Sequence, residues 1–136
     1  MILVDTGPLV ALFNPRDGDH AWSRSTLAAV VEPLVTTVPV LTEAFHLLNP
    51  KSRGARALIE LIERGGMNVW WLSPPTIARA FQLMEQYADR PMDLADASLV
   101  AAAEGLRTTK VFTIDRREFL TYRARIGRQP RTFTLI

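Results

Sequence analysis

The sequence contains no cysteine among its 136 residues. Without thiols, the chain has neither a disulfide framework nor a thiolate metal site, and we expect it to work in a reducing compartment. No segment approaches the ~20 uninterrupted apolar residues of a membrane-spanning helix. The first residues carry no basic leader and do not resemble a secretory signal. We therefore expect a soluble, cytoplasmic protein with no membrane partner.

The composition is that of a globular protein, with 48% hydrophobic and 22% charged residues. A chain of this length buries roughly two-thirds of the surface that its unfolded form exposes. No linker, internal repeat or low-complexity stretch interrupts the sequence. We expect a single domain over residues 1–136.

Short apolar runs alternate with segments of helical periodicity along the whole chain. The runs predict strands at residues 1–5, 34–38, 68–72, 110–114 and 132–135. The periodic segments predict a short helix ending at Phe13 and longer helices over 18–31, 39–48, 52–64, 74–87 and 93–106. Strands that alternate with helices indicate an α/β fold with a central, mostly parallel sheet.

Four carboxylates stand in apolar surroundings. Asp5 and Asp115 each close a predicted strand, and the carboxyl ends of parallel strands share one edge of a sheet. Glu43 and Asp96 lie within largely apolar helical segments. Because an uncompensated charge is unfavourable away from water, these acids predict a shared divalent cation. Hard oxygen ligands suit Mg²⁺ or Mn²⁺, whereas zinc sites favour histidine and cysteine.

Each of these acids also fits a purely structural role. Asp5 and Asp115 are suitable helix caps. Asp93 and Asp96, three residues apart at a helix start, imitate a capping box, although the same spacing puts both on one helix face. We favour Asp96 as the metal ligand and Asp93 as a cap or supporting residue. Glu43 belongs to a narrow polar side of its helix, which a solvated stripe explains equally well.

Basic residues are concentrated toward the end of the sequence. After residue 106 there are eight arginines and lysines but only two acids. Such a local excess attracts a polyanion, or it forms a solvated surface that keeps the protein soluble. The members that we assign to a polyanion such as RNA are Arg116, Arg117, Arg123 and Arg125.

The order of these motifs resembles the PIN-domain ribonucleases, specifically toxins of the VapC type. The resemblance covers essentially the whole chain and is carried by residues 2–12 (ILVDTGPLVAL), 42–44 (TEA), 92–100 (MDLADASLV) and 111–115 (VFTID), followed by Phe119. It implies a three-layer α/β/α sandwich that binds Mg²⁺ or Mn²⁺. It also implies a structured RNA substrate, a small cognate antitoxin and a homodimer.

By position, the resemblance gives the acidic roles to Asp5, Glu43, Asp96 and Asp115. It makes Asp93 an added acid, and it places Thr6 and Thr113 beside the site. In our hypothesis Asp5 and Asp96 are the principal ligands, Glu43 is a further ligand or a base that orients water, and Asp115 serves a second or water-mediated position. A bound cation would activate water for in-line attack on phosphorus, and the basic residues would hold the RNA backbone.

Other functions remain open at this level. One is a PIN-fold module that binds RNA or a partner protein without catalysis or without a toxin role. Another is a phosphatase-like hydrolase with Asp5 as its nucleophile, but Gly7 stands where that chemistry needs a second aspartate. The triplet Asp5-Thr6-Gly7 is also found in aspartic proteases, but its flanking sequence does not suit that fold.

Overall fold

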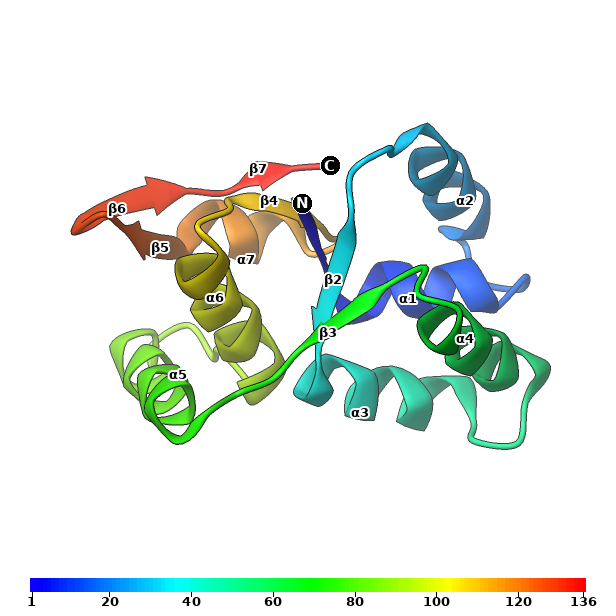
Figure 1. Cartoon of the computed structure of the whole chain (residues 1–136), viewed down its shortest axis with the longest axis horizontal. Helices are drawn as coiled ribbons and strands as arrows, with labels where there is room; N and C mark the ends of the chain where they lie inside the picture. Colours follow the sequence, from blue (N-terminus) through cyan, green and yellow to red (C-terminus); the bar gives the residue numbers. More distant parts are fainter.

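The computed structural model describes all 136 residues, and a five-stranded sheet forms its centre (Figure 1). Every pairing in this sheet is parallel. Along the sheet the strands are β3 (Asn68–Trp70), β2 (Leu34–Thr37), β1 (Ile2–Val4), β4 (Lys110–Phe112) and β7 (Thr134–Leu135). The predicted parallel sheet is confirmed, and β1 and β4 are adjacent at its middle.

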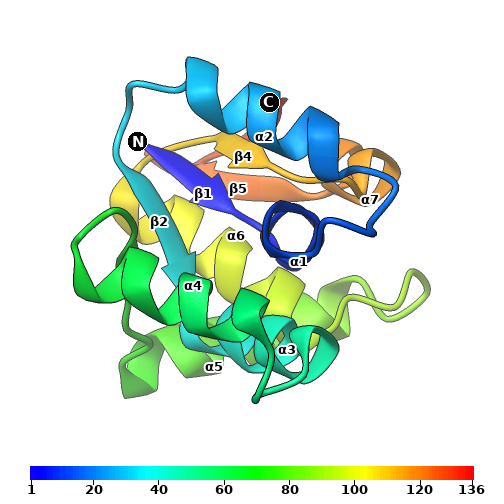
Figure 2. The ribbon, with the colours of Figure 1, turned by 90° about the vertical axis from the view of Figure 1, so that its right-hand side faces the viewer.

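Helices cover both faces of the sheet. They are α1 (Thr6–Phe13), α2 (His20–Ala29), α3 (Val38–Leu48), α4 (Arg53–Glu63), α5 (Pro74–Gln86), α6 (Leu94–Leu106) and α7 (Arg116–Thr121). Figure 2 shows α2 above the sheet and α3 to α6 below it. This arrangement confirms the predicted α/β/α sandwich. None of the helices combines the length and the apolar character that a bilayer crossing requires.

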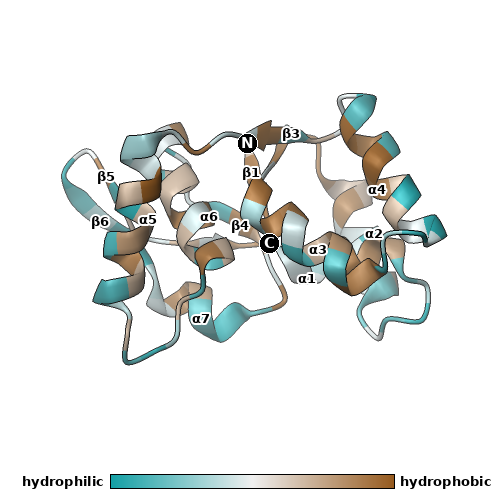
Figure 3. Cartoon of the chain, turned by 90° about the horizontal axis from the view of Figure 1, so that it is seen from below, coloured by the Kyte–Doolittle hydropathy of each residue, from teal (hydrophilic) through white to brown (hydrophobic).

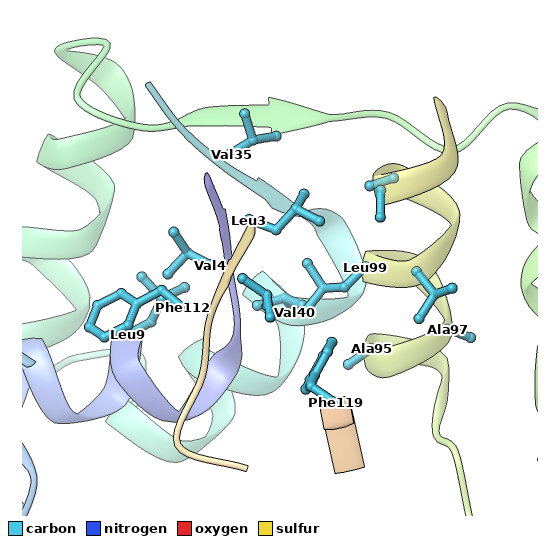
Figure 4. Close-up of a cluster of buried hydrophobic side chains, with 14 of the residues drawn as sticks. Leu3, Val4, Leu9, Val35, Val40, Ala95, Ala97, Leu99, Phe112 and Phe119 are labelled. Atoms are coloured by element: carbon cyan, nitrogen blue, oxygen red, sulfur yellow. The ribbon is translucent and has the colours of Figure 1, made fainter. Parts of the chain in front are cut away.

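The central strands present apolar side chains to both helical layers. In the close-up of Figure 4, Leu3 lies toward Val40 of α3 and Leu99 of α6, whereas Val4 and Phe112 lie together on the other side. All five side chains are at most 2% exposed. The resulting core fixes the ends of β1 and β4 relative to the start of α6.

Helix α6 is buried along most of its length because its residues are small. Nine consecutive residues, 95–103, are buried, and five of them are alanines, at 95, 97 and 101–103. Alanine combines the highest helix propensity with little bulk, so α6 can pack closely between α5 and the sheet. One of these buried residues, Asp96, is a carboxylate.

The segment after Asp115 differs from the prediction. We expected one strand over 132–135, but the chain forms α7, then the antiparallel pair β5 (Arg123–Ile126) and β6 (Gln129–Thr132), and only then β7. The hairpin turns at Gly127 and Arg128, whose φ values of 61° and 69° are those of a tight two-residue loop. Phe133 breaks the strand because it turns inward against Phe119, with ring centroids 5.4 Å apart.

Candidate active site

The carboxyl ends of β1 and β4 bring Asp5 and Asp115 to one edge of the sheet. The backbone N–H of Asp5 donates to the carbonyl of Phe112, at 3.0 Å. The hydroxyl of Thr113 donates to Oδ2 of Asp5 at 2.7 Å, and its oxygen accepts from the backbone N–H of Asp115 at 2.9 Å. Thr113, which is fully buried, therefore links both acids.

Thr6 makes a similar link on the other side of Asp5. Asp5 is the N-cap of α1, and its Oδ1 accepts from the backbone N–H of Thr6 at 2.7 Å. The Thr6 hydroxyl donates to Oε2 of Glu43 at 2.6 Å, across 37 residues of sequence. A hydrogen-bonded chain thus runs from Asp115 through Thr113, Asp5 and Thr6 to Glu43.

Asp96 enters the site from the start of α6. It forms a true capping box with Asp93: the Asp96 N–H donates to Oδ1 of Asp93 at 2.9 Å, and the Asp93 N–H donates to Oδ2 of Asp96 at 3.4 Å. The Tyr122 hydroxyl donates to the same Oδ2 at 3.3 Å. The capping role is therefore real, and it coexists with a position in the cleft described next.

These residues line one cleft of about 430 Å³. Of its 14 lining residues, eight are carboxylates and none is lysine, arginine or histidine: Asp5, Asp17, Asp19, Glu43, Asp93, Asp96, Asp115 and Glu118. The ion pairs of the structure involve other acids, namely Glu32, Glu60 and Glu104. More than half of the chain's 14 acids therefore share one cleft without a cationic side chain to compensate them.

Burial and mutual repulsion favour the protonated forms of the cleft acids. The pKa of Asp5 is raised to about 6, mainly by burial; hydrogen bonds from Thr113 and Thr6 oppose this shift, and the charges of Asp115 and Glu43 add smaller increases. Burial also raises the pKa of Asp96 to about 8, with smaller increases from Asp93, Asp5 and Glu118. At neutral pH the cleft therefore favours added positive charge, either as protons or as a cation.

The donor chemistry of the cleft fits a hard divalent cation. Its polar side chains are mainly carboxylates, and oxygen ligands of this kind suit Mg²⁺ or Mn²⁺. No three of these side chains stand close enough together to form a ready-made ligand set. The structure thus brings all four predicted ligands into one cleft, but it does not bring them into contact around one point.

Sequence reasoning missed three of the cleft acids. Glu118 follows Asp115 by three residues, a spacing that would have suggested a shared helix face had α7 been predicted. Asp17 and Asp19 lie in the loop before α2; Asp19 occupies the N-cap position of that helix, but its side chain makes no capping hydrogen bond. No sequence signal indicated Tyr122, which reaches Asp96 from the C-terminal end of α7.

The four arginines assigned to RNA lie in different places. Arg117 is exposed in a groove that shares Glu118 with the cleft, and Arg116 lines another groove that shares Asp19 and Ile114 with it. Arg123 instead donates to three carbonyls at the end of α7, at 2.8–2.9 Å. The backbone N–H of Arg125 donates a hydrogen bond to Glu104, which lies about 12 Å along α6 from Asp96. The hairpin, largely hydrophilic in Figure 3, therefore extends away from the cleft.

The sequence of the chain is similar to sequences of known proteins. Residues 2–124 match the PIN domain family. Ribonuclease VapC26 of Mycobacterium tuberculosis (strain ATCC 25618 / H37Rv) is 29% identical over 125 residues, which span 90% of this chain and 92% of that protein.

Solved structures share the fold at 21% sequence identity. The crystal structure of M. tuberculosis VapC20, described as a sarcin-ricin loop cleaving toxin, superposes with a TM-score of 0.78 over 96% of this chain and 100% of that one. A toxin–antitoxin complex from Klebsiella pneumoniae gives a TM-score of 0.68 over 89% of this chain and 92% of its counterpart.

Proposed function

Because the chain belongs to the PIN domain family, we propose that it is a Mg²⁺- or Mn²⁺-dependent endoribonuclease and the toxin of a toxin–antitoxin pair. In this proposal residues 1–136 act as one nuclease domain in the cytoplasm and hydrolyse RNA phosphodiesters. The observation that carries it is the cleft of eight carboxylates without a cationic partner, in which Asp5 and Asp96 are buried. Buried, uncompensated acids of this kind cluster at functional sites.

Asp5, Glu43, Asp96 and Asp115 are the residues that would hold the cation. When bound, it supplies positive charge that acidifies a water molecule and stabilises charge on the phosphate. The remaining steps depend on the protein's own side chains, which must keep the carboxylates in position while they are still repelling one another.

Hydrogen bonds within the chain supply that positioning. Thr113 and the N–H of Thr6 each occupy one oxygen of Asp5, so the carboxylate cannot rotate freely. The Thr6 hydroxyl fixes one oxygen of Glu43 in the same way. Each carboxylate oxygen has two lone pairs, so these bonds leave acceptor capacity for a ligand in the cleft.

Asp96 is held by Tyr122 and by the N–H of Asp93. With its pKa near 8, this carboxyl keeps its proton at neutral pH until positive charge enters the cleft. Proton release from Asp96 should then accompany metal binding. Glu43 would serve as a further ligand or as the base that orients the attacking water, because its Oε1 makes no hydrogen bond within the chain.

The relatives support the toxin role and its partners. VapC26 is named a ribonuclease, VapC20 is described as a sarcin-ricin loop cleaving toxin, and the Klebsiella structure is a toxin–antitoxin complex. For this chain we accordingly propose a structured RNA substrate, a cognate antitoxin protein and a homodimeric assembly.

Cleavage of labelled RNA by the purified protein tests the proposal. We expect cleavage with Mg²⁺ or Mn²⁺, none with chelator, and a loss of at least about a hundredfold in Asp5→Asn and Asp96→Asn. Glu63→Gln, which removes an exposed acid outside the cleft, is the matched control and should cleave normally. Equal activity in all four proteins, after removal of contaminating nucleases, would rule out this mechanism.

Growth of a host cell tests the toxin role separately. Expression of the unaltered chain should arrest growth, whereas expression of Asp96→Asn should not. Normal growth together with metal-dependent cleavage in vitro would leave a nuclease that is not a toxin.

A further inference from the structure

A second groove adjoins the acidic cleft. It has a volume of about 480 Å³ and is lined by the end of α1, the end of α3 and the start of α4. Leu47 of α3 lines both this groove and the cleft, so the two hollows are neighbours that share one side chain. Leu47 is 59% exposed, so the boundary between them lies at the protein surface.

The charge of this groove is opposite to that of the cleft. Arg16 and Arg53 are its only charged lining residues, and both are exposed. The ion pairs of the structure use Arg64, Arg79, Lys110 and the N-terminus, so neither groove arginine is neutralised by an acid of the chain. Two free guanidinium groups therefore stand beside a cleft of eight carboxylates.

A close packing contact brings these two arginines together. A Cβ atom at Gly54 would lie 2.3 Å from the carbonyl oxygen of Phe13, so only glycine permits the start of α4 to pack directly on the end of α1. Arg53 precedes Gly54, and Arg16 follows Phe13 by three residues.

Side chains also fix the two backbone segments. The N–H of Arg16 donates to Oδ1 of Asn14 at 3.1 Å, which closes the turn after α1. Ser52 caps α4 by accepting from the N–H of Ala55 at 3.0 Å. The backbones that carry Arg16 and Arg53 are therefore held by specific contacts, and the two long side chains start from defined positions.

We propose that the Arg16–Arg53 groove binds a backbone phosphate of the RNA next to the phosphate that is cleaved. This inference rests on the proposed ribonuclease function and adds a binding subsite to it. A polyanion approaching the acidic cleft is repelled, and guanidinium groups, whose planar donors match phosphate oxygens, offset that repulsion at the cleft edge. RNA is favoured over an acidic peptide because one continuous chain of phosphates can occupy the groove and the cleft together.

Binding of a fluorescein-labelled RNA hairpin, measured by anisotropy in chelator, tests the inference without relying on catalysis. The double variant Arg16→Gln/Arg53→Gln should bind about tenfold more weakly than the unaltered protein. Its plot of log affinity against log salt should be shallower by roughly 0.7, the slope expected for the loss of one contacted phosphate in a single-stranded loop.

Arg24→Gln/Arg64→Gln is the matched control. It removes the same charge from exposed positions that line neither the cleft nor the groove, and it should bind RNA normally. Arg16→Lys/Arg53→Lys should recover part of the affinity, because lysine keeps the charge but loses the planar donors. Thermal melting of each variant shows whether it is folded.

Three outcomes would overturn the inference. The first is equal RNA affinity in the groove variant and the control, and the second is absence of RNA binding by the unaltered protein. The third is a groove variant that binds RNA normally but no longer binds the antitoxin, which would assign the groove to a protein partner. Cleavage assays separate these from failure of the proposed function. If the unaltered protein cleaves RNA and the groove variant does so with the same KM, only the phosphate subsite is wrong.

Discussion

The two ends of α6 hold one buried and one partly buried acid in opposite circumstances. Glu104, near the C-terminal end, accepts from Nε and Nη2 of Arg79, both at 2.8 Å, and from the N–H of Arg125 at 2.9 Å. Asp96, eight residues earlier, has hydrogen-bond donors but no cation, and other acids surround it. The same helix therefore carries one acid that is fully compensated and one that is not.

This difference separates an acid that maintains the fold from one that serves a function. The Arg79–Glu104 pair ties α5, α6 and β5 together, and its two parallel hydrogen bonds give it a fixed geometry. The capping box accounts for the place of Asp96 beside Asp93, but it does not account for burial near Asp5 and Glu118, which is unfavourable for the charged form of Asp96. We infer that the crowded acids of the cleft lower the stability of the metal-free protein, and that a bound cation would offset this loss.

Removal of Arg79 should produce the largest loss of stability. Arg79→Met leaves the partly buried Glu104 without its partner, and we expect the free energy of unfolding to fall by about 2 kcal/mol. Arg79→Met/Glu104→Met removes both charges and should recover part of that loss. Urea denaturation measures both changes, and RNA cleavage per folded molecule should be unaffected. An unchanged unfolding midpoint in Arg79→Met would show that the pair does not stabilise the fold.

The cleft acids should have the opposite effect on the metal-free protein. The pKa of Asp5 is about 6 in the fold against 3.8 without it, so its protonated form is favoured when the chain is folded. The contribution of Asp5 to the free energy of unfolding is most favourable below pH 3.8 and is lost as the pH rises to about 6. For Asp96 the corresponding loss continues to about pH 8. Asp5→Asn should therefore stabilise the metal-free protein at pH 7, by about 1–2 kcal/mol.

Denaturation at pH 5 and pH 8, in chelator and in Mn²⁺, measures this dependence. In chelator, the advantage of Asp5→Asn and Asp96→Asn over the unaltered protein should grow as the pH rises. In Mn²⁺ that advantage should disappear or reverse, because a bound cation stabilises only the folded state that carries the carboxylates. A constant difference across pH and metal would show that these acids are compensated like Glu104.

The fold was predictable from the sequence up to Asp115. Runs such as Ile2–Val4 and Lys110–Phe112 are short, apolar and separated by helical periodicity, which is the pattern that local physics determines best. After Asp115 the pattern fails. Strand β5 alternates polar and apolar residues over only four positions, β6 is exposed throughout, and the turn between them depends on two consecutive residues with positive φ.

The site was predictable only in part, for a related reason. Asp5 and Asp115 could be placed because parallel strands end at one edge, and Asp96 because it interrupts an apolar helix. Asp17, Asp19 and Glu118 come from loops or a short helix whose position depends on tertiary packing. We assigned the four arginines to RNA because basic residues are frequent in that part of the sequence. Their frequency does not show that Arg125 lies near the end of α6 that is distant from the cleft.

The smallest effect on cleavage activity is expected from Thr113, which helps position an acid but would not bind the cation. Thr113→Val keeps the shape of the side chain and removes the hydroxyl that donates to Asp5 and accepts from the N–H of Asp115. Loss of this kind of support around a metal ligand lowers activity about 10- to 100-fold. Thr132→Val, on the exposed strand β6, is the matched control and should be fully active. Because the hydroxyl favours the charged form of Asp5, its removal should also move the rise of activity with pH to higher pH. That shift separates a positioning role from mere loss of packing, which would lower activity at every pH alike.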